Sequence, residues 1–122
     1  MSAQENRDTL ETYRQEFFER QNIDAIDDLM HDDYVEEYPQ SGERTRGKDN
    51  ARAVYENYPG RPNLIDYSYM LEGDLAVVEM NLDYEGHRMN ACEIVEFEDG
   101  KIKRDRGTSP SPSRRPSGGR NG

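Results

Sequence analysis

From Asn63 onward, apolar and polar residues alternate, and only short turns interrupt the pattern. Four extended segments are visible, at residues 63–71, 75–84, 87–98 and 101–106. The residues between them are Glu-Gly-Asp, Glu-Gly and Asp-Gly, and an Asp-Gly pair between two extended segments is a strong hairpin signal. Alternation with a period of two is typical of strands that bury one face. The second half of the chain therefore predicts an antiparallel meander of four strands.

The same alternation divides the side chains between the two faces of the sheet. One face of strand 87–98 is apolar except for a single acid, and it consists of Met89, Ala91, Glu93, Val95 and Phe97. The corresponding apolar set in strand 75–84 is Val78, Met80 and Leu82. Along the last strand, strict alternation aligns Ile102, Arg104 and Arg106 on the inner face and directs Asp105 outward.

The first half of the chain reads as helical. Leu10, Tyr13 and Phe17 form an apolar stripe, widened by Phe18, on a helix predicted over residues 7–21. A second, short helix is expected over residues 22–33, capped by Asn22, followed by a strand at 34–39 and a polar loop at 40–47. The third helix follows Gly47 and ends at Pro59. The expected buried positions of helices two and three are Ile23, Ile26, Leu29 and Met30, then Ala51, Val54, Tyr55 and Tyr58. This order predicts an α+β fold, with the helices on one face of a curved antiparallel sheet.

Charge and composition limit the expected partners. The 122 residues carry a net charge of −10, and the residues before Gly107 hold 13 basic against 26 acidic side chains, a charge of −13. Such a surface repels nucleic acid and anionic membranes, so we expect neither as a partner. Only 32% of the residues are hydrophobic, which is low for a self-sufficient core. We therefore expect a homodimer that covers the outer sheet face near Cys92 and Ile94.

No metal or other cofactor is expected. Cys92 is the single cysteine, so an intrachain disulfide or a thiolate metal cluster is excluded. His31, expected near the end of the second helix, and His87, beside a turn, lack a second histidine or a carboxylate at metal-ligand spacing. The N-terminus has no apolar signal core, and no apolar run approaches the length of a membrane span, so we expect a cytoplasmic protein.

Three stretches resemble the SnoaL-like group of the nuclear transport factor 2-like superfamily. They are NIDAIDDLMHDDYVEEYPQSGERTRG at 22–47, YPG at 58–60 and FEDGKI at 97–102, within a resemblance that covers roughly residues 8–106. It implies a SnoaL-like domain over residues 1–106, shaped as a cone in which a bent sheet wraps around helices, with an apolar pocket and usually a dimer. The superfamily includes ketosteroid isomerase, limonene epoxide hydrolase, polyketide cyclases and non-catalytic binding modules, so the fold does not decide the function.

Glu93 and Tyr13 are the candidate catalytic residues. An acid on an apolar inner face has its ionised form disfavoured by desolvation, and it can act as a hydrogen-bond donor or as a general base. By the resemblance, Glu93 falls where ketosteroid isomerase, a worked case of pKa tuning, keeps its hydrogen-bonding acid. Tyr13 lies near the position of that enzyme's oxyanion tyrosine. The alternatives are that Glu93 forms a structural ion pair with Arg104, and that Tyr13 is a core residue.

Tyr38 stands immediately before Pro39, where the resemblance places the catalytic base of ketosteroid isomerase. A neutral tyrosine cannot abstract a proton at physiological pH, which argues against steroid isomerisation. Glu36 shares the face of Tyr38 by alternation, whereas Glu37 points the other way. The Arg-x-Asp arrangement expected of the epoxide hydrolase, beside a second inward aspartate, is not found, because alternation directs Asp105 outward.

Two functions remain open from the sequence. The first is a cofactor-free isomerase, cyclase or hydrolase that acts on an apolar, oxygenated small molecule through Glu93. The second is a non-catalytic ligand-binding or dimerisation module with the same pocket. Besides Tyr13 and Glu93, the expected ligand-binding residues are Phe17, Tyr38, Met80, Leu82, Met89, Val95 and Arg104.

Residues 107–122 are rich in Ser, Pro, Gly and Arg, and such a composition cannot form a core. We expect a disordered basic tail. The alternative hypothesis is an out-of-frame reading that begins near Arg106, because a shifted frame can encode the aromatic, Pro- and Trp-bearing ending that the resemblance leads us to expect. The nucleotide sequence of the gene would decide between the two.

Overall fold

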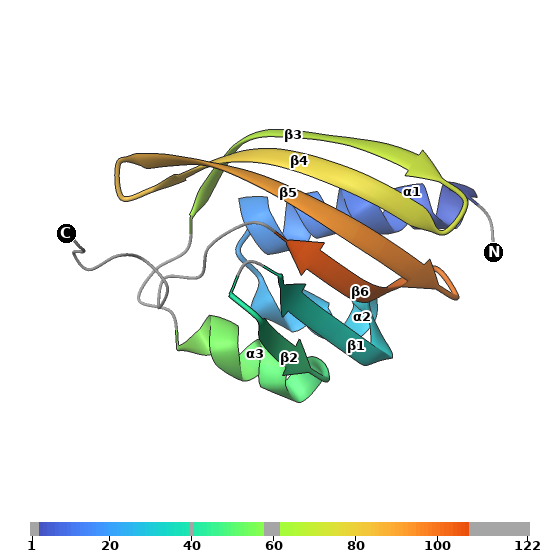
Figure 1. Ribbon diagram of the computed structural model, residues 1–122. Helices are drawn as coiled ribbons and strands as arrows, with labels where there is room; N and C mark the ends of the chain where they lie inside the picture. The colour runs from blue at the N-terminus through green and yellow to red at the C-terminus, as the bar shows by residue number, and fades with distance from the viewer. Residues whose placement is uncertain (1–2, 40, 58–61, 108–122) are drawn as a thin grey trace.

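Six strands form one curved sheet, with helices along its inner face (Figure 1). The computed structural model describes residues 3–39, 41–57 and 62–107. The helical segments are α1 (Ala3–Thr12), the π-helix η1 (Tyr13–Glu19), the 3-10 turn η2 (Ile23–Ala25), α2 (Ile26–Leu29) and α3 (Lys48–Glu56). The strands are β1 (Met30–Tyr38), β2 (Glu43–Arg46), β3 (Asn63–Glu72), β4 (Leu75–Tyr84), β5 (His87–Glu98) and β6 (Lys101–Gly107). The predicted α+β class is confirmed.

The strand order is β2-β1-β6-β5-β4-β3. The predicted meander of β3 to β6 is confirmed, and all of its neighbours pair antiparallel. The tight turn between β5 and β6 has Asp99 at φ 56° and Gly100 at φ 76°, the positive φ values that the Asp-Gly pair predicts. β1 pairs parallel with β6, and this pairing places the first strand of the chain inside the sheet, between β2 and β6.

The second helix is shorter than predicted. Asn22 caps η2 by accepting a hydrogen bond from the Asp24 amide at 3.1 Å, as expected. The chain leaves the helix at Met30, whose backbone is extended and which pairs with Ile102 of β6. His31 therefore lies in a strand and not at a helix end. The predicted polar loop at 40–47 also contains β2, which pairs with β1 as a hairpin. Both differences arise because sheet pairing overrides local helix and loop signals.

The N-terminal helix α1 is hydrogen-bonded to the turns of two β-hairpins. Asn6, which is fully buried, donates hydrogen bonds of 2.9 Å to the Gly73 carbonyl and to an Asp74 carboxylate oxygen in the β3–β4 turn. Thr9 donates to the Gly100 carbonyl in the β5–β6 turn. None of the helices in the described ranges has the length and apolarity that a membrane crossing requires.

The core lies between the helices and the inner face of the sheet. The positions predicted as buried on helices that the structure confirms are Leu10, Tyr13, Phe17, Ile26, Leu29, Met30, Ala51 and Tyr55. The other buried apolar residues are Ala25, Tyr34, Ala76, Val78, Met80, Leu82, Tyr84, Ala91, Val95, Phe97 and Ile102. Ile23 and Val54 are half-buried, and Tyr58 lies outside the described residues, as does the tail from residue 108.

Candidate functional site

Three carboxyl groups from three neighbouring strands meet on the inner face of the sheet. Glu36 of β1 is the direct partner of Asp105 of β6 in the parallel ladder. Asp105 in turn pairs with Val95 of β5, two residues from Glu93. Because side chains two residues apart on a strand share a face, this register brings Glu36, Glu93 and Asp105 together.

The carboxyl cluster, defined as Glu36, Glu93 and Asp105, is buried. Asp105 is 2% exposed and Glu36 is 5% exposed. Glu93 as a whole residue is half-buried, but its Oε1 atom is fully buried. Both carboxylate oxygens of Asp105 and the Oε1 atoms of Glu36 and Glu93 receive no hydrogen bond from any donor in the described part of the chain. Buried acceptors of this kind are rare, since each one costs free energy.

Burial raises the pKa of all three carboxyl groups, and repulsion by neighbouring carboxylates adds to this effect at Glu93 and Asp105. Desolvation raises the pKa of Glu93 to about 8, and the charge of Glu36 adds to this effect. Desolvation and the charges of Glu93 and Glu36 hold the pKa of Asp105 well above its usual range. Because the Glu93 and Asp105 carboxyl groups lie within hydrogen-bonding reach of each other, a proton held by this pair is shared.

Tyrosines surround Glu36 and favour its ionised form. Tyr55 of α3 donates a hydrogen bond of 2.5 Å to Glu36 Oε2, and Tyr38 also hydrogen-bonds this carboxyl group. The Tyr34 hydroxyl approaches the same group but completes no hydrogen bond, although Tyr34 is fully buried. Desolvation raises the pKa of Glu36, and these hydroxyl groups lower it in part. Glu36 is therefore the member of the cluster best suited to carry a negative charge.

The predicted orientation of Arg104 and Asp105 is wrong. Arg104 lies on the outer face, where its guanidinium donates to Glu37 Oε1 at 3.0 and 3.2 Å, and it forms no pair with Glu93. The cause is a β-bulge: Glu96 pairs with Arg104 and Phe97 with Ile102, so Lys103 is an extra residue in β6. A bulge reverses the alternation beyond it, which turns Asp105 inward. Arg104 therefore does not reach the interior as a ligand-binding residue.

The helix that faces the cluster is a π-helix at this point. In a π-helix the turn is wider than in an α-helix, so residues four and five positions apart share a face. The Tyr13 ring lies 5.3 Å from the Phe17 ring and 5.1 Å from the Phe18 ring. Tyr13 is buried, and the charges of Glu93, Asp105 and Glu36 add to desolvation in raising its pKa. Tyr13 therefore stays a neutral hydroxyl beside the carboxyl cluster.

The other expected ligand-binding residues lie in or against the core. Phe17, Met80, Leu82 and Val95 are buried, whereas Tyr38 and Met89 are half-buried. Their placement on the inner face agrees with the alternation. A cavity among them stays a prediction.

Comparison with known proteins places the chain in a family. The sequence model of the SnoaL-like domain family matches residues 10–105. The chain belongs to the SnoaL-like family. A comparison with curated proteins finds no significant match for this SnoaL-like protein.

Solved structures share the fold of this SnoaL-like protein. An NTF-2 like protein of unknown function from Burkholderia xenovorans LB400 is 30% identical, with a TM-score of 0.78 over 85% of this chain and 81% of that one. An LEH-like epoxide hydrolase from M. tuberculosis is 21% identical, with a TM-score of 0.68 over 85% of this chain and 81% of that one. A de novo designed protein with a curved β-sheet is 19% identical, with a TM-score of 0.72 over 92% of its own length and 94% of this chain.

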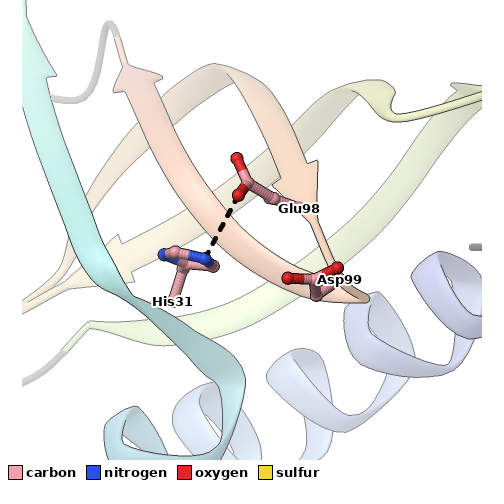
Figure 2. Close-up of side chains that lie close together, drawn as sticks. All are labelled: His31, Glu98 and Asp99. Atoms are coloured by element: carbon pink, nitrogen blue, oxygen red, sulfur yellow. Dashed lines mark ion pairs between the residues drawn. The ribbon is translucent and has the colours of Figure 1, made fainter.

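A second group of ionisable side chains lies at the edge of this SnoaL-like fold, where β1 approaches the β5–β6 turn (Figure 2). His31 Nε2 lies 3.6 Å from a Glu98 carboxylate oxygen, and Asp99 is near both. The spacing argument missed this group because its members are far apart in sequence. Two contacts disfavour a metal here. Lys103 pairs with Glu98 at 2.7 Å, and the Asp33 amide donates to His31 Nδ1, which places the histidine proton on Nε2.

Proposed function

We propose that this SnoaL-like protein is a cofactor-free acid–base catalyst, an isomerase, cyclase or hydrolase, that acts on a small apolar molecule bearing oxygen. The observation that carries the proposal is the carboxyl cluster, in which tyrosine hydroxyl groups surround Glu36 and the other two carboxyl groups lie within hydrogen-bonding reach of each other. Groups whose environments separate their pKa values are suited to opposite roles in proton transfer. Glu36 supplies a buried carboxylate on the same strand face as Tyr38, the residue at the position where the resemblance led us to expect a base.

In the proposed reaction, the Glu36 carboxylate accepts a proton from a substrate carbon or from an attacking water. When a carbon is deprotonated, the C–H electron pair moves through the adjoining carbonyl group onto its oxygen. When water attacks, its oxygen bonds to a substrate carbon, and the C–O bond that breaks leaves its electron pair on the substrate oxygen. That oxygen accepts a hydrogen bond or the proton from the Glu93–Asp105 pair, and the Tyr13 hydroxyl supplies a further donor. In an isomerisation, the proton on Glu36 then passes to another carbon, and any proton on the oxygen returns to the pair; in a hydrolysis, the proton on Glu36 replaces the one that the pair gave up. Positioned acids and bases of this kind each contribute roughly 10²- to 10⁴-fold in rate.

Two small probes test the proposal: isomerisation of cyclohex-3-enone to its conjugated isomer, and hydrolysis of cyclohexene oxide. We expect the wild-type protein to accelerate at least one of them, and we expect Glu36→Gln and Glu93→Gln to lose about 10²-fold or more of that rate. Glu79→Gln is the matched control, because Glu79 is exposed on β4. Wild-type inactivity on both probes, or full activity in both interior variants, would refute the proposal.

A dimerisation role is the second candidate, and the outer face of the sheet favours it. Met70 is 73% exposed, Leu75 48% and Ile94 36%. In the sheet, Ile94 pairs with Val77, and Val77 pairs with Met70. Ile94, Val77 and Met70 therefore form one apolar row across β5, β4 and β3. Arg106 extends this row on one side. A second copy of the chain would cover the apolar row.

We expect light scattering at micromolar concentration to give the mass of a dimer for the wild-type protein and that of a monomer for Ile94→Asp. A charge in the middle of an apolar interface costs several kcal/mol when unpaired, which is enough to dissociate a weak dimer. Asp83→Asn, on the neighbouring strand β4, is a control that should leave the dimer intact. A monomeric wild-type protein would rule out this role.

A further inference from the structure

The interior of this protein lacks positive charge. Among the described residues, no lysine, arginine or histidine is buried. The ionisable groups that face the carboxyl cluster come from six elements, and all are acids or phenols: Tyr13 of η1, Tyr34, Glu36 and Tyr38 of β1, Tyr55 of α3, Tyr67 of β3, Glu93 of β5 and Asp105 of β6. An anionic ligand would add a further negative charge to this group, which makes it unfavourable.

Among the described residues, five buried polar atoms of the site lack a hydrogen-bond partner. Four are carboxyl oxygens, two on Asp105 and one each on Glu36 and Glu93. The fifth is the hydroxyl oxygen of Tyr34, a fully buried side chain. A ligand with several donors satisfies these oxygens once the Glu93–Asp105 pair releases a proton. An alkylammonium group has three N–H donors in a small volume and a charge opposite to that of the cluster.

Aromatic rings continue the site on the side of η1. The Phe17 ring lies 4.9 Å from the Tyr55 ring, and the Phe18 ring lies 6.5 Å from the Tyr67 ring. Together with Tyr13, these side chains form an uninterrupted series of aromatic contacts from α3 to β3. Aromatic faces attract cations, and Trp, Tyr and Phe are the side chains that recognise ammonium ligands. The surroundings of the carboxyl cluster therefore suit an apolar cation.

We propose that the ligand of the carboxyl cluster is an apolar amine in its ammonium form, held by Glu36, Glu93 and Asp105 with the aromatic rings of η1 around its apolar part. This inference rests on the proposed function and narrows its substrate to an oxygenated molecule that also carries a basic nitrogen. Charge balance is compatible with that function. In the proposed arrangement without ligand, Glu36 is the anion, because the tyrosine hydroxyl groups favour its charge, and the Glu93 and Asp105 carboxyl groups, whose pKa values are raised, each hold a proton. The ammonium charge lets the pair release one of them, and the other stays shared and available as the acid.

Three six-membered-ring probes of similar shape test the proposal on the full chain: cyclohexylamine, cyclohexanol and cyclohexanecarboxylate. We expect calorimetric titration at pH 7 to show the amine binding at least about ten-fold more tightly than the alcohol, and the carboxylate not binding. We also expect the release of up to one proton per amine bound. Titration in two buffers with different ionisation enthalpies measures this number. Equal binding of amine and alcohol, binding of the carboxylate, or the absence of proton release would overturn the proposal.

Variants distinguish amine binding at the carboxyl cluster from nonspecific amine binding to the acidic surface. We expect Asp105→Asn and Glu93→Gln each to remove the preference for the amine over the alcohol, and Glu79→Gln to retain it. If Asp105→Asn fails to fold, Glu93→Gln alone tests whether the carboxyl cluster causes the preference for the amine. If both interior variants still prefer the amine to the alcohol, the amine binds to the acidic surface, and the proposed site at the carboxyl cluster is refuted. Because cyclohex-3-enone and cyclohexene oxide are neutral, turnover of either by a protein that does not prefer the amine refutes this inference and leaves the proposed function standing.

Discussion

The free energy of unfolding of the wild-type protein is expected to fall as the pH rises from 5 to 8. Glu36, Glu93 and Asp105 all have a raised pKa in the folded state. Above the unfolded pKa, the folded protein therefore binds more protons than the unfolded chain, and stability decreases with pH. The slope is about 1.4 kcal/mol per pH unit for each extra proton. For Glu93 the window runs from the ordinary glutamate pKa of 4.5 to its folded-state pKa of about 8, so the loss amounts to several kcal/mol.

Urea unfolding at a series of pH values measures this loss, and Glu93→Gln identifies its source. The variant cannot titrate at residue 93, so its stability relative to the wild type should increase steadily between pH 5 and 8. Glu79→Gln should keep the wild-type slope, because Glu79 is exposed. Surface acids with a lowered pKa, such as Glu11 and Glu98, change stability with the opposite sign, and they do so mainly below pH 5. A stability that is flat or rises from pH 5 to 8 would mean that the cluster is solvated.

Phe17→Ala should destabilise the protein by about 3–5 kcal/mol, as expected for the truncation of a buried phenylalanine. Phe17 is 4% exposed and its ring contacts Tyr13, Phe18 and Tyr55. The substitution leaves a cavity between η1 and α3 and removes aromatic contacts that contribute beyond their buried area. Since small domains are stable by only about 5–15 kcal/mol, the variant should unfold at a much lower urea concentration.

Phe18→Ala is the comparison for this prediction. Phe18 belongs to the same π-helix and packs on the same ring system, but it is only partly buried. Its truncation should therefore cost clearly less than that of Phe17. If the two variants were equally stable, or if Phe18→Ala were the weaker one, the packing of η1 against the core would differ from that described above.

Local signals in the sequence were sufficient for most of the sheet. The turns at Glu85–Gly86 and Asp99–Gly100 adopt positive φ values, and few residue pairs other than those ending in Gly tolerate this. Alternation then places Glu93 and Glu36 on the inner face, as the structure has them. These features could be predicted because turn chemistry and a period of two act within a few residues.

Asp105 could not be predicted, because a bulge has no strong local signature when the extra residue is an ordinary Lys103. The polar sequence from Lys103 to Arg106 is equally compatible with both registers, and pairing with β5 and β1 selects one of them. The interaction of Glu93 with Asp105 and Glu36 was missed for the same reason. Likewise, the early start of β1 at Met30 depends on its pairing with Ile102, 72 residues later in the chain.

The attachment of α1 to the hairpin turns has a consequence for the order of events during synthesis. The helix is synthesised first, but Thr9 and its hydrogen-bond acceptor at Gly100 are separated by 91 residues. β1 likewise cannot pair with β6 until β6 has been synthesised. At roughly 5–20 residues per second, a ribosome needs about 5–20 seconds to make that stretch. For this time the aromatic side chains of η1 have no sheet to pack on, and long-range pairings of this kind also form slowly. The nascent chain should therefore be a chaperone client until β6 has emerged.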